Sequence, residues 1–321
     1  SHGVRMDNVF DGSQTTQEEM EPGETFAYKL KFPDAGMYWY HPHVREDYQQ
    51  ELGLYGNFFV IPGSADYWPP VNREVPLFLD DILIEDGRIV LSKQGADHTL
   101  MGRFGNVMLV NGETNYVLSA KKDEIVRFYV TNAANTRPFN FAIEGLKLKR
   151  VGADGGAYER DQWIDAVTLG PSERVIVEVL FENSGTFAIQ NKTPNKTYTL
   201  GSVVISESPV DISYARQFTQ LKIHQKTIRD VDSLRTQFGK VPDKQITLSI
   251  TMMGGGMGDH MHGGMMGGAG SDGIEWEDTN VMMNQMATVG STFWKIIDQD
   301  TSRENMGIDW AFKRGEPVKI R

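Results

Sequence analysis

The sequence of 321 residues contains no cysteine, no long apolar run and no concentrated patch of positive charge. Without cysteine, residue usage says nothing about the redox compartment of the protein. No segment approaches the roughly 20 apolar residues of a membrane-spanning helix, so we expect no membrane span. The net charge is −11, which argues against nucleic acid or an anionic lipid surface as a partner. What remains is a composition with 40% hydrophobic residues and a length typical of two or three domains.

Short strand-like runs alternate with turn signals along most of the chain, and this rhythm predicts an all-β fold. Residues 26–32 alternate apolar and polar side chains before a turn, and residues 56–61 form an apolar run of the buried type. About nine further runs follow within roughly 135 residues, the size of a complete β-sandwich. These runs cover residues 75–82, 106–110, 124–131, 139–143, 146–151, 167–169, 174–180, 185–190 and 201–206.

Composition shifts mark the expected domain boundaries. Trp68-Pro69-Pro70 indicates an interdomain linker, and the polar stretch over residues 207–244 indicates a long connection with one helical turn. Residues 245–250 read as the first strand of another domain. We therefore expect a partial first domain at 1–63, a complete second domain at 66–208, a linker at 209–244 and the start of a third domain at 245–321.

Two histidine elements are candidate metal ligands. His41 and His43 stand one residue apart at the end of the strand-like run Tyr38-Trp39-Tyr40, and residues i and i+2 of a strand share a face. Pro42 is compatible with a strand end or edge. His2 supplies a second element at the start of the chain. Imidazole is a ligand for copper and for zinc, and the spacing alone does not separate the two metals.

These motifs resemble those of multicopper oxidases, a family that includes laccases, spore-coat oxidases and copper-efflux oxidases. His2-Gly3 resembles the second half of the family's His-x-His-Gly motif, and residues 38–43 resemble its second His-x-His motif. Residues 75–81 and 109–112 resemble the start of its second domain, so the likeness extends over nearly the whole chain. It implies cupredoxin-like Greek-key β-sandwich domains, one complete and two partial. It also implies that His2, His41 and His43 are ligands of a trinuclear copper cluster.

The resemblance further implies a chain that is truncated at both ends. The family's first motif has a histidine two places before His2, and its third and fourth histidine motifs would follow strands expected at 308–313 and 318–321. The fourth motif contains cysteine, which the sequence lacks. We therefore expect the mononuclear copper site to be missing and the chain to be inactive alone. The middle domain has no histidine pair and is expected to be a spacer.

Asp11 is a candidate catalytic acid. The family has an acidic residue nine positions after the histidine that His2 matches, where it is implicated in proton delivery. Reduction of dioxygen to water consumes protons, so a carboxylate near the site has a chemical role. The alternative is a surface turn at Asp11-Gly12.

A methionine-rich segment is the third feature. Glycine interrupts any periodicity in it and contributes no packing, whereas thioether sulfur favours Cu(I). We interpret it as a Cu(I)-binding loop, because copper-efflux oxidases carry a methionine-rich insert early in the third domain; a flexible loop without metal is the alternative. Its candidate ligands are Met252, Met253, Met257, His260, Met261, His262, Met265 and Met266.

The resemblance predicts an oxidoreductase that takes single electrons from cuprous ion or a small phenolic donor and reduces dioxygen to water. Its expected cofactor is copper, and its expected location is the periplasm or the extracellular space. Two alternatives stay open: a non-enzymatic copper-binding or copper-tolerance protein, and a scaffold that has lost copper. Retention of His2, His41 and His43 argues against the scaffold.

Overall fold

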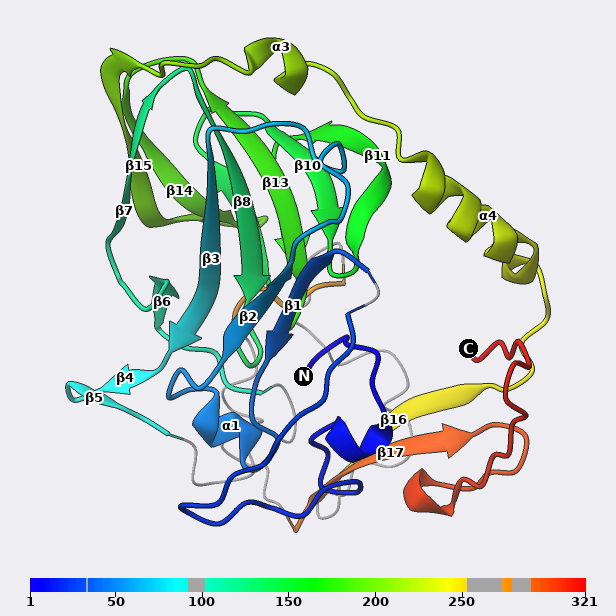
Figure 1. Cartoon of the computed structure of the whole chain (residues 1–321). Helices are drawn as coiled ribbons and strands as arrows, with labels where there is room; N and C mark the ends of the chain where they lie inside the picture. The colour runs from blue at the N-terminus through cyan, green and yellow to red at the C-terminus, as the bar shows by residue number, and fades with distance from the viewer. Residues whose placement is uncertain (33, 92–101, 253–272, 279–289) are drawn as a thin grey trace. The chain divides into compact units, whose positions relative to one another are not determined.

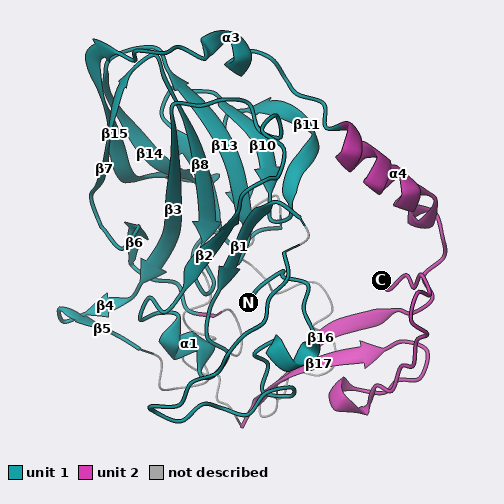
Figure 2. Cartoon of the chain, viewed as in Figure 1, with its two compact units in different colours: residues 1–91, 103–224, 269–277 teal, residues 92–102, 225–268, 278–321 magenta. Residues whose placement is uncertain are grey.

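The computed structural model describes residues 1–32, 34–91, 102–252, 273–278 and 290–321. Two compact units divide the chain, and each is described by itself (Figure 2). Unit 1 comprises Ser1–Leu91, Arg103–His224 and Ala269–Glu277, and unit 2 comprises Ser92–Gly102, Gln225–Gly268 and Asp278–Arg321. No helix in the described part of the chain is long and apolar enough to cross a membrane.

Most of unit 1 is a β-sandwich of two sheets (Figure 1). The first sheet has the order β11-β10-β13-β8-β3-β6, and the second has the order β12-β9-β14-β15-β7. Neighbouring strands are antiparallel except for the parallel pairs β3–β8 and β15–β7. The strands of the first sheet are β3 (Arg73–Ile82), β6 (Val107–Val110), β8 (Glu124–Asn132), β10 (Leu148–Ala153), β11 (Gly156–Ile164) and β13 (Arg174–Phe181). Those of the second are β7 (Tyr116–Lys122), β9 (Phe139–Ile143), β12 (Val167–Leu169), β14 (Gly185–Lys192) and β15 (Thr197–Pro209).

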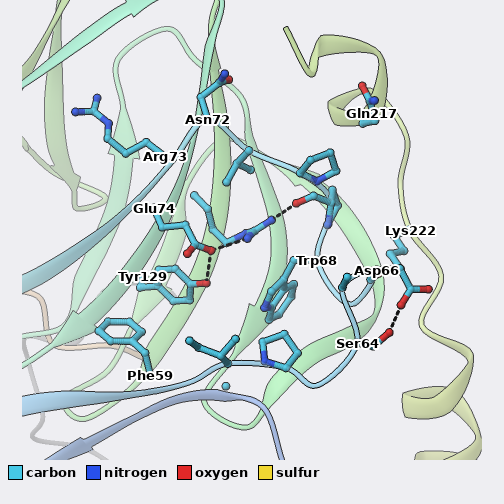
Figure 3. A pocket seen from close by; sticks show the side chains of 18 of the residues that line it. Phe59, Ser64, Asp66, Trp68, Asn72, Arg73, Glu74, Tyr129, Gln217 and Lys222 are labelled. Carbon is cyan, nitrogen blue, oxygen red and sulfur yellow. Dashed lines mark hydrogen bonds and ion pairs between the residues drawn. The ribbon is translucent and has the colours of Figure 1, made fainter. Parts of the chain in front are cut away.

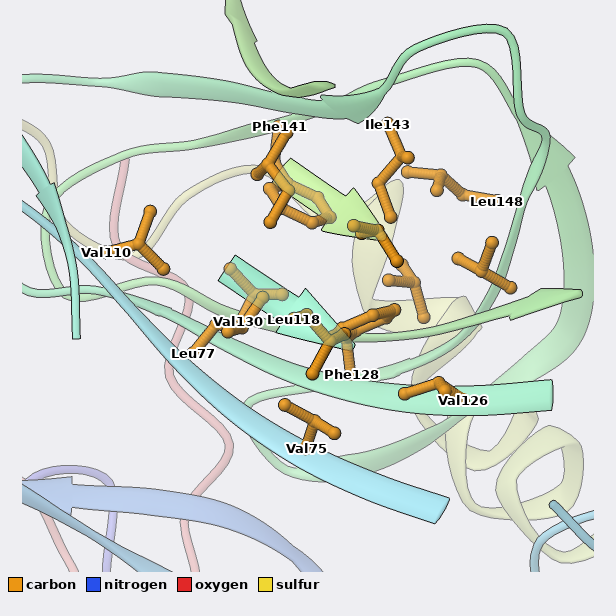
Figure 4. Packing of buried hydrophobic residues seen from close by; sticks show 14 of the residues in the cluster. Val75, Leu77, Val110, Leu118, Val126, Phe128, Val130, Phe141, Ile143 and Leu148 are labelled. Atoms are coloured by element: carbon orange, nitrogen blue, oxygen red, sulfur yellow. The ribbon is translucent and has the colours of Figure 1, made fainter. Parts of the chain in front are cut away.

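The hydrophobic core lies between these two sheets (Figure 4). Leu77 and Phe128 reach it from the first sheet, and Phe141, Ile143 and Val203 reach it from the second. Phe128 and Phe141 are fully buried. Alternate residues of each strand face inward because successive side chains point to opposite faces. The expected all-β, cupredoxin-like class is confirmed, and none of the described residues in 66–208 forms an α-helix.

The smaller elements of unit 1 lie before, between and after the sandwich strands. A two-stranded antiparallel sheet joins β1 and β2, with Gly36 opposite Val60 and Tyr40 opposite Gly56. A second small sheet joins β4 and β5. These elements are the 3-10 helix η1 (Asn8–Phe10), β1 (Gly36–Tyr40), α1 (Glu46–Gln49), β2 (Gly56–Val60), β4 (Ile84–Glu85), β5 (Arg88–Ile89) and α3 (Ala215–Phe218).

A close backbone approach holds the start of β1 to the hairpin between β10 and β11. Gly156 has a φ of +115°, and a Cβ atom there would lie 2.5 Å from the Ala35 carbonyl oxygen and 2.6 Å from the Tyr67 hydroxyl oxygen. A larger residue would therefore push the first strand away from the sandwich. This contact fixes where β1 stands relative to the two large sheets.

Unit 2 contains one helix and one two-stranded ribbon in its described residues. The helix α4 spans Gln225–Phe238, and β16 (Ile246–Met252) pairs antiparallel with β17 (Thr292–Asp298). A 3-10 helix, η2, covers Asn305–Gly307. The strand expected at 245–250 is confirmed as part of β16.

Three predictions about secondary structure are wrong. Residues 26–32 form no strand, and neither do residues 308–313 and 318–321. In the described residues, segments 26–32 and 308–313 have no partner strand, and an alternating pattern forms a strand only when a neighbour shares its backbone hydrogen bonds. Residues 318–321 exchange backbone hydrogen bonds with residues 243–246, but the pairing is limited to a single bridge between Lys244 and Ile320.

The stretch 207–244 contains the short α3, about one helical turn, and in addition α4, a helix of 14 residues that was not expected. Ile228, Val231, Leu234 and Phe238 recur at helical spacing within it, a period masked by the many charged residues between them. The strands β7 and β11 were missed because polar and charged residues, such as Lys121 in β7 and Glu159 in β11, interrupt their apolar pattern.

Candidate metal centre

The strand β1 places the histidine motif at one end of a buried aromatic segment. Trp39 is fully buried, and the strand ends at Tyr40, immediately before His41. His2 joins this strand end, because its backbone N–H donates a hydrogen bond of 2.8 Å to the Trp39 carbonyl oxygen. The two histidine elements, which stand almost 40 positions apart in the sequence, therefore meet at one edge of β1.

The imidazole rings lie close together. His2 Nδ1 is 3.3 Å from His41 Nε2, and the ring centroids of these two residues are 5.5 Å apart. The rings of His41 and His43 are stacked with centroids 5.0 Å apart, as the i, i+2 spacing suggests. The Trp39 ring also stacks on the His41 ring, with centroids 4.5 Å apart. No three His, Cys, Asp or Glu side chains in the described ranges are arranged to hold a metal ion, so the three-histidine ligand set stays a prediction.

Burial favours the neutral form of His2 and His41. Burial, together with the neighbouring His43, lowers the pKa of His41 to about 4. The pKa of His2 is also lowered, first by burial and then by the charge of Arg174. His2 Nδ1 and His41 Nε2 face each other across 3.3 Å, and only one proton fits between them. At least one of these two nitrogen atoms therefore presents a lone pair. Neutral imidazole is the form that binds copper or zinc, and the pair fits such an ion.

Arg174, at the start of β13, is the residue near this site that sequence reasoning missed. Its buried guanidinium donates from Nε to the Met37 carbonyl oxygen (3.2 Å) and from Nη1 to the Ser172 carbonyl oxygen (2.9 Å), and it pairs with Asp154. Its charge also acts on His2. The middle domain is thus more than a spacer, because it contributes a buried cation beside the histidine motif. An isolated arginine carries no motif that could have revealed this.

The other predicted site residues are less closely connected to the histidines. Asp11 follows η1, is exposed, and acts electrostatically on the amino group of Ser1. Met252 is the last residue of β16. The remaining candidates of the methionine-rich segment lie outside the described residues: Met253, Met257, His260, Met261, His262, Met265 and Met266.

Comparison with known proteins decides the family. Two family models, both described as multicopper oxidase, match residues 1–65 and 71–208. The chain belongs to the multicopper oxidase family. The chain is 23% identical over 271 residues to multicopper oxidase mco of Staphylococcus haemolyticus, and the match covers 74% of this chain and 59% of that relative. It is 27% identical over 205 residues to multicopper oxidase MmcO of Mycobacterium tuberculosis, covering 56% of this chain and 40% of the relative.

Solved structures agree with this assignment. The multicopper oxidase structure from Pseudomonas thermotolerans matches this chain with a TM-score of 0.56 and 27% identity, over 66% of this chain and 51% of that one. A structure from Pseudomonas parafulva matches with a TM-score of 0.55 and 27% identity, over 65% of this chain and 51% of that one. The chain therefore spans about half of these structures' length. Membership of the family implies a copper cofactor.

A buried polar network of unit 1 adjoins the histidine motif through Trp39. The rings of Trp39 and Tyr55 are 6.3 Å apart, and the Tyr55 hydroxyl donates a hydrogen bond of 2.7 Å to Asp80 Oδ2. Burial raises the pKa of Asp80 to about 7. The neighbouring Asp81 accepts from Arg137 Nε at 2.7 Å. Asp80 and Asp81 belong to the segment whose resemblance to the family was noted, and the structure shows that both are buried rather than solvated.

Proposed function

We propose that the chain supplies copper ligands to a multicopper oxidase that couples one-electron oxidation of a donor to the four-electron reduction of dioxygen to water. The observation that carries the proposal is the pair of neutral imidazoles of His2 and His41, with facing nitrogen atoms 3.3 Å apart. Bound copper would store and transfer the electrons in this chemistry. His2, His41 and His43 would hold the metal.

The residues around the pair would orient the ligands and limit access by water. Trp39 stacks on His41 and restricts the rotation of its ring. His41 Nδ1 lies 3.3 Å from Glu46 Oε1, and a carboxylate beside the second ring nitrogen favours the tautomer in which Nε2 is free to bind metal. Asp11 is proposed to supply protons to the site, supported by its spacing from His2.

The electron donor is proposed to be cuprous ion or a small phenol, and the expected location is the periplasm or the extracellular space. The methionine-rich segment supports a cuprous donor, since its thioethers favour Cu(I). The family resemblance implies a cysteine ligand for the mononuclear copper, and this chain has no cysteine. We therefore expect no oxygen consumption with a phenol from this chain alone. A non-enzymatic copper-tolerance protein would also consume no oxygen.

Quenching of Trp39 fluorescence by Cu(II) would test the histidine site, because the indole lies 4.5 Å from His41. We expect His41→Ala to weaken the apparent affinity for Cu(II), as read from the quenching curve, at least about ten-fold, since one of few ligands is lost. Trp39→Phe should abolish that part of the signal. The matched control is the double variant His260→Asn, His262→Asn, which leaves this pair intact and should quench like the wild type. Equal quenching in the wild type and His41→Ala would contradict the site.

Competition with a Cu(I) chelator would test the methionine-rich segment separately. The variant replaces Met252, Met253, Met257, Met261, Met265 and Met266 by Leu. Leucine keeps the apolar volume but removes the soft sulfur ligands, so Cu(I) uptake should fall. Unchanged uptake would remove the support for a cuprous donor and leave the histidine site unaffected.

A further inference from the structure

Unit 1 contains a cavity whose lining includes none of the three histidines of the candidate metal centre. The cavity has a volume of about 1320 Å³ and is bordered by residues after β2, by the Trp68–Pro70 segment, by β3 and β8, and by residues 217–222 after α3. All of these segments belong to unit 1. Binding sites for small molecules are commonly concave and mainly apolar, with a few polar groups that fix orientation.

The polar floor of the cavity is built around Arg127. Its side chain is buried, and it donates from Nη1 to Glu74 Oε1 (2.7 Å), from Nη2 to Glu178 Oε1 (2.7 Å) and from Nη2 to the Pro69 carbonyl oxygen. Lys149 pairs with the other oxygen of Glu178 at 2.8 Å. Two cations thus balance two carboxylates. Four of the five N–H donors of Arg127 are engaged and its charge is balanced, so the floor offers no uncompensated positive charge to an anion.

Glu74 presents a hydrogen-bond acceptor to the cavity. Its Oε1 atom accepts from both Arg127 and the Tyr129 hydroxyl, which lies 2.9 Å away. Burial raises the pKa of Tyr129, so this phenol stays protonated and continues to donate. In the described part of the chain, Glu74 Oε2 has no such partner, and the side chain is 55% exposed. A fixed carboxylate oxygen therefore remains for a ligand.

Aromatic and apolar side chains form the walls beside this oxygen (Figure 3). Phe59 meets Tyr129 edge to face with ring centroids 5.0 Å apart, and 44% of Phe59 is exposed. Trp68 lies against Arg127, whose guanidinium carbon is 5.4 Å from the indole centroid. Ile61 at the rim is 86% exposed. These surfaces favour a flat apolar ring over a flexible polar chain.

We propose that this cavity binds a neutral aromatic molecule that carries an O–H or N–H donor. The ring packs between the Phe59–Tyr129 pair and Trp68, and the donor bonds to Glu74 Oε2. An anion would place its charge against Glu74 Oε2, and the pairing of Glu74 and Glu178 with Arg127 and Lys149 weakens the attraction for a cation. The site needs no copper and is separate from the metal centre.

Calorimetric titration of the metal-free chain with three naphthalene probes tests the proposal. 2-Naphthol has the donor, 2-methoxynaphthalene has the same rings without it, and 2-naphthoate carries a negative charge. We expect 2-naphthol to bind about ten-fold more tightly than the ether, the factor that corresponds to one hydrogen bond to a charged acceptor. 2-Naphthoate should bind more weakly than both. Equal affinity for the alcohol and the ether in the wild type would overturn the proposal without any variant.

Two variants and a control locate the binding. Ala65→Trp places a large ring in the cavity from an exposed position and should abolish binding. Glu74→Gln keeps an acceptor for Arg127 and Tyr129 but can turn an amide N–H₂ toward the ligand, so the preference for the alcohol should disappear. Val117→Ser, at an exposed position outside the cavity, should bind like the wild type. Unchanged binding of 2-naphthol by a folded Ala65→Trp variant would place the ligand elsewhere and overturn the assignment.

Discussion

The sandwich of unit 1 and the ribbon of unit 2 are both made of strands, but they bury their side chains very differently. In the sandwich, Leu77 and Phe128 are fully buried between two sheets. In the ribbon, Leu248 is 68% exposed, and Trp294 and Ile296 are 43% and 44% exposed. A two-stranded ribbon has no second layer to cover its apolar face. The comparison shows that a strand pattern alone does not supply stability; the second sheet does.

Truncation of a core residue should separate the two regions most clearly. Phe128→Ala should lower the free energy of unfolding by about 3–5 kcal/mol, because it opens a cavity between the sheets. Leu248→Ala in the ribbon should change it by less than about 0.5 kcal/mol, because the side chain is already mostly exposed. Urea unfolding of both variants measures the contrast. Similar losses would mean that the ribbon is covered in solution.

The two regions should also differ in how their stability depends on pH, because the pKa values of Asp80 and Asp298 are shifted in opposite directions. Burial raises the pKa of Asp80 in the sandwich from 3.8 to about 7, whereas hydrogen bonds from Thr301 and Trp310 lower the pKa of Asp298 at the end of β17. Between about pH 4 and pH 7 the folded sandwich holds a proton on Asp80 that the unfolded chain has released. The free energy of unfolding should therefore fall as the pH rises through this range, by up to about 4 kcal/mol.

Asp80→Asn should flatten that fall, because the amide has no proton to release. The exposed Glu182→Gln serves as the matched control and should keep the wild-type slope. Unfolding curves at several pH values between 4 and 7 give the slopes directly. A slope in Asp80→Asn equal to that of the wild type would show that another group is responsible.

The smallest effect is expected on α4 in unit 2. Lys226 Nζ lies 3.0 Å from Asp230 Oδ2 at i, i+4 spacing, and both side chains are largely exposed. Asp230→Asn should cost about 0.2–0.5 kcal/mol at low ionic strength. The cost should shrink in high salt, which screens exposed charges. A loss above about 1 kcal/mol that persists in salt would indicate that α4 packs against something through this face.

Much of the fold could be predicted from the sequence because sandwich strands carry a local signature. Alternating side chains and turn residues marked β8, β9 and β13 within a residue or two of their bounds. Among the four edge strands of the sandwich, β6 and β12 were also found, whereas β7 and β11 were missed because polar and charged residues interrupt their apolar pattern. The segments 26–32 and 308–313 show the converse: their local pattern favours a strand, but no neighbour in the described residues pairs with it.

The sequence by itself indicated the family and the candidate histidine ligands, since motif spacing is a property of the chain. Only the tertiary structure decided that His2 and His41 face each other at 3.3 Å, and that Arg174 from β13 stands beside them. It also decided that Asp80 is buried against Tyr55. The physical reason is that distances between residues far apart in sequence, and the desolvation of a charge, depend on which surfaces pack together.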